Sequence, residues 1–245
     1  MKKSCKNGKI KIMFKTWWRD YKKLLDTDRR WIAIWLLTYF TFLILDIFIP
    51  DYQGSALLKY VGIFSCTVYA YQRSRKDSAL ILALFLTFLA DTILVWTDWE
   101  VFGVIIFSFA QFMHISRQAD RPPKALLGFS VVLILCYAFA RILGFTPIYA
   151  IGMIYAAEII INTGLSVQRY KKHKREVRAR CGFYGFMCFI ACDTCVGLRH
   201  LALDGILPTI IVPLVSFLVW FFYFPSQVLL ANSTTLPPKL QNKTR

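Results

Sequence analysis

The chain consists mainly of long apolar runs separated by short polar connections. Each run is long enough for one helix to cross the hydrocarbon core of a bilayer, which takes about 20 residues. The eight runs lie at residues 31–49, 55–72, 79–97, 99–116, 125–142, 147–167, 182–202 and 206–230. This pattern predicts an all-α polytopic membrane protein, a bundle of about eight transmembrane helices.

The composition agrees with this interpretation. Hydrophobic residues make up 57% of the 245 residues and charged residues only 18%, which is more apolar material than a soluble domain can bury. A net charge of +16 would suggest a nucleic-acid partner for a soluble protein. In a membrane protein the location of the charges matters more than their sum, and we predict no nucleic-acid partner.

The position of the charges predicts an orientation in the membrane. Lys and Arg are concentrated near the N-terminus and in alternate connections, at residues 1–30, 72–78, 117–124 and 168–180. The connections between these carry acidic but no basic residues, at 50–54, 98–100 and 203–205. Because cytoplasmic connections are enriched in Lys and Arg, we predict that both termini are cytoplasmic, in a multi-pass protein of the cell membrane.

Three parts follow from this pattern. Residues 1–30 are predicted to be a basic cytoplasmic segment, 31–230 the transmembrane domain and 231–245 a flexible cytoplasmic tail. At 10–25, apolar and aromatic side chains share one helical stripe with Lys and Arg opposite, which favours a helix on the membrane surface. Ordinary basic flanking sequence is the alternative interpretation.

Two aspartates stand inside apolar runs. Asp91 lies in 79–97 and Asp193 in 182–202, and each is followed by threonine. At about 1.5 Å per helical residue, both lie well inside the hydrocarbon core, where an ionised carboxylate costs about 2.5 to 3.5 kcal/mol. Such residues usually face a partner or a hydrated cavity. We therefore expect the two carboxyl groups to meet at one depth inside the bundle.

Other polar side chains within the runs are candidate substrate-binding residues. They are Lys59, Gln111, His114, Glu158, Tyr223 and Gln227. Lys59 can reach the membrane surface, hold a phosphate or pair with an aspartate. Glu158 shares a helix face with Tyr155 and Asn162 and can simply join helices by hydrogen bonds. The three cysteines of run 182–202 have helical spacing, but we interpret them as small apolar residues and predict no metal and no cofactor.

Four sequence stretches together carry a family resemblance. They are Leu89–Asp91 with Thr92–Leu94, Phe102–Gly103 leading to Phe107–Ala110, Phe189–Asp193 and Tyr223–Gln227. In order and spacing they resemble the YhhN family, the lysoplasmalogenase-like membrane proteins. The resemblance implies an eight-helix bundle that hydrolyses the vinyl-ether bond of lysoplasmalogens to a fatty aldehyde and a glycerophospho-alcohol. It implies that Asp91 and Asp193 are the catalytic pair. The same pocket would be lined by Lys59, Tyr223 and Gln227.

The chain departs from the family pattern at several positions. Ala90 and Cys192 precede the aspartates, where the family usually has Gly and Ser. The usual His with a Tyr three residues later is replaced by Gln111 and His114, and Tyr60 stands where a Pro is expected. If the missing histidine takes part in the chemistry, His114 on the next turn is the candidate to replace it.

Vinyl-ether cleavage suits a pair of carboxyl groups. A proton delivered to carbon produces an oxocarbenium ion, water captures this ion as a hemiacetal, and the hemiacetal collapses. Two carboxyl groups in a low-dielectric pocket do not readily both ionise. One is therefore predicted to act as the acid, while the other stays charged, stabilises the cation and activates water. Either aspartate could take either role.

Two other functions fit the same residues. Asp91, Glu158 and Asp193 would equally suit a proton relay in a transporter, and the two Asp-Thr pairs suggest a parallel repeat. Alternatively, the carboxyl groups only hold helices together in a non-catalytic membrane protein. A lipid-sized pocket with one mouth would favour the hydrolase, a path to both faces the transporter, and a packed interior the third function. The expected partners of the hydrolase are a lysophospholipid substrate and membrane lipid.

Overall fold

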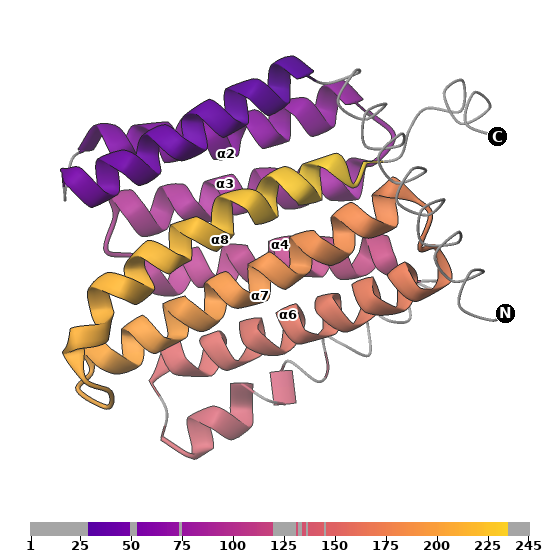
Figure 1. Ribbon diagram of the computed structural model, residues 1–245. Coiled ribbons are helices and arrows are strands. Elements are labelled where there is room, and N and C mark those ends of the chain that lie inside the picture. The colour runs from indigo at the N-terminus through magenta and orange to yellow at the C-terminus, as the bar shows by residue number, and fades with distance from the viewer. Residues whose placement is uncertain are drawn as a thin grey trace, which may run out of the picture.

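Long helices that run side by side make up the fold (Figure 1). The computed structural model describes residues 29–49, 53–73, 75–119, 131, 134–135, 137–144 and 146–234. Within these residues every element of secondary structure is helical. The long elements are an N-terminal helix (Arg29–Phe48), α2 (Gln53–Arg73), α3 (Ser78–Trp96), α4 (Glu100–Gln118), α6 (Pro147–Lys172), α7 (Val177–Leu203) and α8 (Val212–Asn232), with the short 3-10 helix η1 (Thr209–Ile211) before α8.

The helices coincide with the predicted apolar runs, apart from run 125–142, half of which lies outside the described residues. The segment 10–25 and most of the tail 231–245 also lie outside them. Among the described residues, five helices are long and apolar enough to cross a membrane: the N-terminal helix, α3, α6, α7, and η1 with α8. Helices α2 and α4 have similar lengths, 21 and 19 residues, but do not belong to this set by composition. The prediction of an all-α polytopic membrane protein is confirmed.

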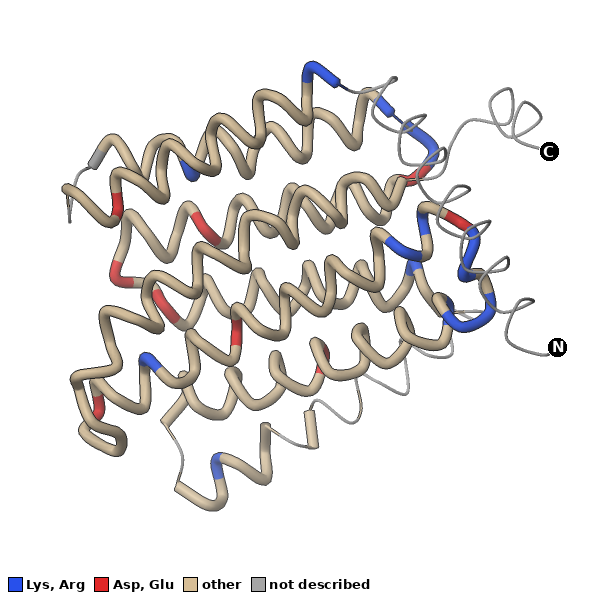
Figure 2. Tube along the Cα trace, viewed as in Figure 1, with Lys and Arg blue, Asp and Glu red and all other residues tan. Residues whose placement is uncertain are grey.

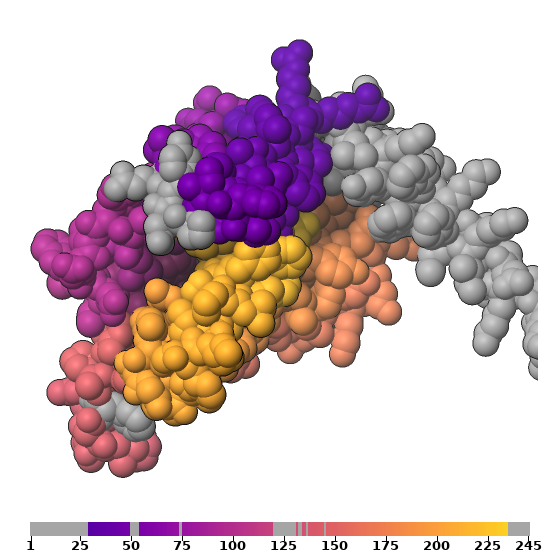
Figure 3. Space-filling view, turned by 60° about the vertical axis from the view of Figure 1, so that its left-hand side comes forward, coloured from indigo at the N-terminus to yellow at the C-terminus, as the bar shows by residue number. Residues whose placement is uncertain are grey.

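Six helices form a closed ring. Successive helices pack against each other from α2 to α8, and α8 packs back against α2. The N-terminal helix lies outside this ring, where Trp35 Nε1 donates a 2.8 Å hydrogen bond to Ser65 Oγ on α2 and the Tyr39 hydroxyl donates one of 2.9 Å to the Phe221 carbonyl on α8. Figure 3 shows the indigo N-terminal helix and α2 lying against the yellow α8. The interior of the ring is therefore built from α2, α3, α4, α6, α7 and α8.

Helices α7 and α8 pack closely at Gly185. A Cβ atom at this position would lie 2.9 Å from Leu230 Cγ and 3.2 Å from the Leu230 backbone nitrogen. Such distances are shorter than ordinary van der Waals contact, so the absence of a side chain at Gly185 allows the two backbones to approach. By contrast, a Cβ at Gly164 on α6 would meet nothing within 4 Å.

Replacing Gly185 with Ala is therefore expected to destabilise the bundle by about 1–3 kcal/mol, because the Leu230 backbone as well as its side chain must move. Thermal unfolding of the purified protein in detergent measures this effect. The matched control is Gly164→Ala, which adds the same methyl group to a helix where there is room for it, and which should be neutral or slightly stabilising. Equal melting temperatures for the two variants would contradict the close α7–α8 contact.

The two ends of the bundle differ in charge. Figure 2 shows Lys and Arg gathered at one end, around the α2–α3 and α6–α7 connections, while the opposite end carries mainly Asp and Glu. At the basic end, Arg117 of α4 donates hydrogen bonds to both carboxylate oxygens of Asp77, at 2.9 to 3.2 Å. The side chains of Arg117 and Asp77 are only 7% and 6% exposed. This buried ion pair joins the end of α4 to the start of α3.

Candidate active site

Asp91 lies on the inner face of α3. This helix buries one stripe of residues at mainly three- and four-residue intervals, namely Leu80, Ala83, Leu84, Thr87, Ala90 and Asp91. Asp91 is 9% exposed, and its Oδ2 accepts a 2.6 Å hydrogen bond from the hydroxyl of Tyr223 on α8. Helix α8 thus supplies the hydrogen-bond partner of the acid on α3.

Asp193 takes the corresponding position on α7. It follows Phe189 by one turn, and Phe189 and the neighbouring Cys192 are both buried. The Asp193 side chain is half-buried, and its Oδ2 accepts a 3.1 Å hydrogen bond from the hydroxyl of Tyr155 on α6. Each of the two aspartates is therefore held by a tyrosine from another helix.

The two Asp–Tyr pairs share one environment inside the ring. The Phe107 ring lies between the two tyrosines, with its centroid 5.7 Å from the Tyr155 ring and 6.5 Å from the Tyr223 ring. The tyrosines that hold the two aspartates thus contact one aromatic ring, while the meeting of the carboxyl groups and their catalytic roles stay predictions.

A polar seam runs between α4 and α6 from this region towards the basic end. Asn162 Nδ2 donates hydrogen bonds of 2.9 Å to both the side-chain and the backbone oxygen of Gln111. Gln118 Nε2 donates a 2.9 Å hydrogen bond to Asn162 Oδ1. Gln111 and Asn162 are fully buried, as is Glu158 at 1% exposure. The sequence analysis selected Gln111 and Glu158 as site residues but placed Asn162 only on the face it shares with Glu158.

Several buried polar atoms of this interior are not hydrogen-bonded to the described residues. Gln111 Nε2, both ring nitrogens of His114, Glu158 Oε2 and Gln227 Oε1 are buried and have no hydrogen-bond partner among the described residues. Because buried polar atoms in folded proteins almost always have partners, these atoms are suited to binding water or a polar group of a ligand. These atoms belong to α4, α6 and α8, so potential hydrogen-bonding positions for a ligand lie on several helices of the ring.

His114 and Lys59 lie at opposite margins of the site. The His114 ring packs edge-to-face on Phe186 with centroids 5.2 Å apart, on the side of the basic end. Lys59 Nζ forms a 2.7 Å salt bridge with Asp46 and lies 4.7 Å from the Trp220 ring centroid. Trp220 in turn contacts Tyr223 at 5.5 Å. Of the three roles that the sequence left open for Lys59, the structure shows pairing with an aspartate.

Tyr155 is, with Asn162, a site residue that the sequence did not predict. It was placed on the Glu158 face of its helix, but nothing in the sequence indicated that its hydroxyl would bind Asp193 on α7. The usable signal was the aromatic hydroxyl three residues before an intramembrane carboxylate. Gln227, which was selected, lies one turn beyond Tyr223, is fully buried, and donates a 3.3 Å hydrogen bond to Ser226 Oγ.

Comparison with known proteins gives a family match. The YhhN family matches residues 54–234 of this chain. The matched range begins at the second residue of α2 and contains the rest of the ring, both aspartates and both tyrosines. No curated protein and no solved structure matches the chain.

Proposed function

We propose that this chain, which belongs to the YhhN family, hydrolyses the vinyl-ether bond of lysoplasmalogens to a fatty aldehyde and a glycerophospho-alcohol. The observation that carries the proposal is that Asp91 and Asp193 each accept a hydrogen bond from a tyrosine of another helix inside the bundle, and that both tyrosine rings contact Phe107. The family resemblance supplies the substrate class, and the pair of carboxyl groups supplies the acid and base that the reaction needs.

The reaction consumes one water molecule, and the carboxyl group that acts as the acid regains its proton by the end of the cycle. The acid transfers a proton to the vinyl carbon remote from oxygen, and the double bond becomes an oxocarbenium ion. Water adds to the carbon next to oxygen and gives its proton to the second carboxylate. The second carboxyl group, now protonated, then protonates the glycerol oxygen of the hemiacetal, and the bond from carbon to that oxygen breaks to release the alcohol. The hemiacetal hydroxyl gives its proton to the first carboxylate as the aldehyde forms, which restores both groups. The charged carboxylate also stabilises the cation electrostatically.

The hydrogen-bond lengths favour one assignment of the two roles. Hydrogen bonds from a hydroxyl to an ionised carboxylate are typically about 2.5–2.7 Å. The bond from Tyr223 to Asp91 measures 2.6 Å and fits this range, whereas that from Tyr155 to Asp193 measures 3.1 Å. We therefore assign Asp91 the role of the charged group that activates water, and Asp193 the role of the acid.

Asp193 lies beside an exposed stretch of α7. Its side chain is half-buried, and Gly197, one turn further along α7, is exposed, with no atom within 4 Å of the position of an added Cβ. This open stretch supports an entrance for the lipid chain on the Asp193 side. In the proposed arrangement the basic end of the bundle faces the cytoplasm, and the protein acts in the cell membrane on a lysophospholipid that is already there.

Purified protein incubated with a lysoplasmalogen in deuterated water tests the proposal. Fatty aldehyde should be released, and aldehyde trapped at once by reduction should carry one deuterium on the carbon next to the former carbonyl, because that carbon receives the proton. The matched 1-alkyl lysophospholipid has no double bond and should give no product. Absence of aldehyde from folded protein, judged by a cooperative thermal transition, would remove the hydrolase function.

Removing the hydroxyl of Tyr223 should slow this reaction. In Tyr223→Phe the ring packing is kept, but the hydrogen bond to Asp91 is lost. A hydrogen bond to a charged group contributes about 1.5–3 kcal/mol, so kcat should fall roughly 10- to 100-fold, with little change in KM. Aldehyde release at saturating substrate measures this.

The control is Tyr149→Phe, which removes a hydroxyl that binds the exposed Asp204 instead. This variant should keep the activity of the natural protein. The role given to Tyr223 would be wrong if the two variants lost activity equally, or if Tyr223→Phe turned over at the original rate.

A further inference from the structure

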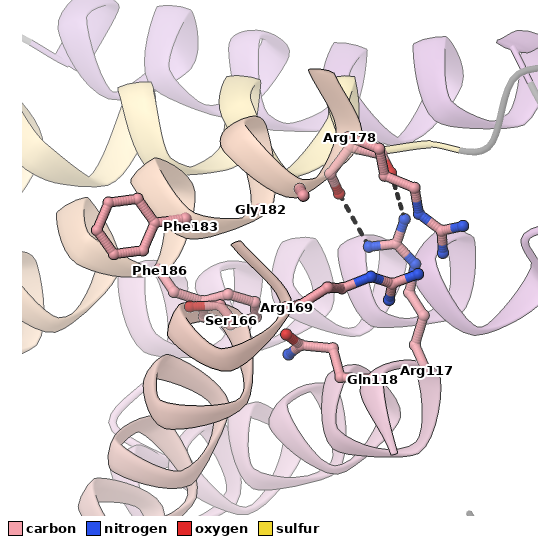
Figure 4. A pocket seen from close by; sticks show the side chains of 10 residues that line it. Arg117, Gln118, Ser166, Arg169, Arg178, Gly182, Phe183 and Phe186 are labelled. Atoms are coloured by element: carbon pink, nitrogen blue, oxygen red, sulfur yellow. Dashed lines mark hydrogen bonds between the residues drawn. The ribbon is translucent and has the colours of Figure 1, made fainter. Parts of the chain in front are cut away.

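A shallow hollow opens at the basic end of the bundle, away from the aspartates (Figure 4). Three arginines from three helix ends line it: Arg117 in the last turn of α4, Arg169 in the last turn of α6 and Arg178 in the first turn of α7. The enclosed part measures about 10 Å³, which is about the space of one water molecule. A larger group would therefore occupy the mouth, where Figure 4 shows the three arginine side chains coming together.

The hollow has more positive than negative charge around it. Asp77 is the main counterion, and it is bound directly by Arg117 and lies 3.8 Å from Arg178. Arg178 Nε is buried without a hydrogen-bond partner among the described residues. Arg169 adds a third charge close enough to act on Arg117. Glu176 also acts on Arg178, but it is exposed and pairs with His173 at 3.1 Å.

The backbone adds donors at the same place. Helix α7 begins at Val177, and its N-cap residue Glu176 makes no side-chain capping hydrogen bond. The first N–H groups of a helix have no acceptors within the helix and point towards its N-terminus, where the helix dipole is positive. Arg178 and Ala179 of this first turn line the hollow. Side chains and backbone therefore present donors to the same volume.

We propose that this hollow binds a phosphoryl group, carried either by an anionic lipid of the adjacent leaflet or by free phosphate. Arginine presents a planar fork of donors that matches phosphate oxygens, and helix N-termini bind the same groups. The three helix ends lie at the end of the bundle, at the level that lipid headgroups occupy. Phe183 and Phe186 form an apolar wall beside the arginines, which suits the glycerol and first acyl carbons of a phospholipid.

This phosphoryl site is separate from the one that the substrate of the proposed reaction must use. Along α7, Gly182 at the hollow and Asp193 are about 16 Å apart, and along α3, Asp77 and Asp91 are about 21 Å apart, at about 1.5 Å per residue. In a lysoplasmalogen only the glycerol unit separates the phosphate from the vinyl ether, which is far shorter. Binding at the arginines does not depend on the proposed reaction, and only the distinction between the two sites rests on it.

Thermal unfolding of the full-length protein in detergent tests the site. The melting temperature is measured with phosphatidic acid, with phosphatidylcholine as the zwitterionic control, and with inorganic phosphate alone. At a hundredfold excess over Kd, a ligand that binds only the folded protein should raise the melting temperature by roughly 5–10 °C. We expect that rise with phosphatidic acid and not with phosphatidylcholine. An equal rise with inorganic phosphate identifies free phosphate as a sufficient ligand, and a rise with phosphatidic acid alone identifies the lipid.

Two double variants with equal loss of charge locate the effect. Arg169→Gln with Arg178→Gln removes two arginines of the hollow and leaves the Asp77–Arg117 pair in place. Lys174→Gln with Arg175→Gln removes two exposed charges of the neighbouring connection that do not line the hollow. The Arg169/Arg178 double variant should bind phosphatidic acid at least tenfold more weakly than the natural protein, and the Lys174/Arg175 double variant should bind it equally well. If the Arg169/Arg178 double variant does not fold, the single variant Arg169→Gln replaces it in the test. Equal shifts in both variants, or no shift in the natural protein, overturn the proposal.

Discussion

Asp91→Asn and Asp193→Asn are each expected to reduce kcat for aldehyde release by about 10²–10⁴-fold, the usual contribution of a positioned acid or base. Asparagine has nearly the same shape as aspartate and can still accept a hydrogen bond from a tyrosine hydroxyl, so packing in the ring should survive. It can neither deliver a proton to carbon nor carry the negative charge that stabilises the oxocarbenium ion. Initial rates at saturating lysoplasmalogen measure the loss.

Substitutions of two exposed aspartates are the controls for the loss of activity in Asp91→Asn and Asp193→Asn. Asp98→Asn and Asp204→Asn change exposed aspartates at the acidic end of the bundle and should leave kcat unchanged. Because the two buried aspartates act in one reaction, the double variant should lose little more than the worse single variant. Full activity in both single variants would exclude the proposed mechanism even if the protein releases aldehyde.

Asp77→Asn is expected to have the largest effect on stability, a loss of about 3–5 kcal/mol in the free energy of unfolding. The change leaves the buried guanidinium of Arg117 without its counterion, although Arg117 still donates a 2.8 Å hydrogen bond to Ser233 Oγ. Since that pair joins α3 to α4, and Ser233 follows α8, the whole basic end should loosen. Thermal or denaturant unfolding in detergent measures the change.

A second ion pair provides the control for Asp77. Glu176 pairs with His173 at 3.1 Å, but both side chains are about half exposed, at 56% and 50%. Exposed pairs contribute little because water screens them and the long side chains must be ordered. Glu176→Gln should therefore leave the melting temperature almost unchanged. A similar loss in both variants would show that burial of the Asp77–Arg117 pair is not what stabilises this end.

The sequence was sufficient to predict the helices that the structure describes and the inward position of both aspartates. Length and apolar composition determine a membrane helix almost alone, and a carboxylate such as Asp91 is costly anywhere except the interior. The partners of the aspartates were harder to predict. That Tyr155 binds Asp193 depends on how α6 rotates and slides against α7, and the apolar periodicity of two membrane helices does not determine this.

The basic end illustrates the same limit. The sequence placed Arg117, Arg169 and Arg178 in connections that were expected to be cytoplasmic, and interpreted them as orientation signals. Only the ring arrangement brings the ends of α4, α6 and α7 together so that the three guanidinium groups line one hollow. For Lys59 the sequence left three roles open, because its partner Asp46 belongs to the N-terminal helix, whose docking outside the ring involves contacts distant in the sequence.

The order in which the helices are synthesised determines whether each aspartate enters the membrane before or after its tyrosine partner. Tyr223 follows Asp91 by 132 residues, so the ribosome delivers Asp91 to the lipid long before its hydroxyl partner exists. The order is reversed for Asp193, because its partner Tyr155 has already been synthesised when Asp193 leaves the ribosome. Until α8 is inserted, Asp91 therefore lacks the hydroxyl that binds it in the folded protein, and biogenesis should be most vulnerable to faults between the insertion of α3 and that of α8.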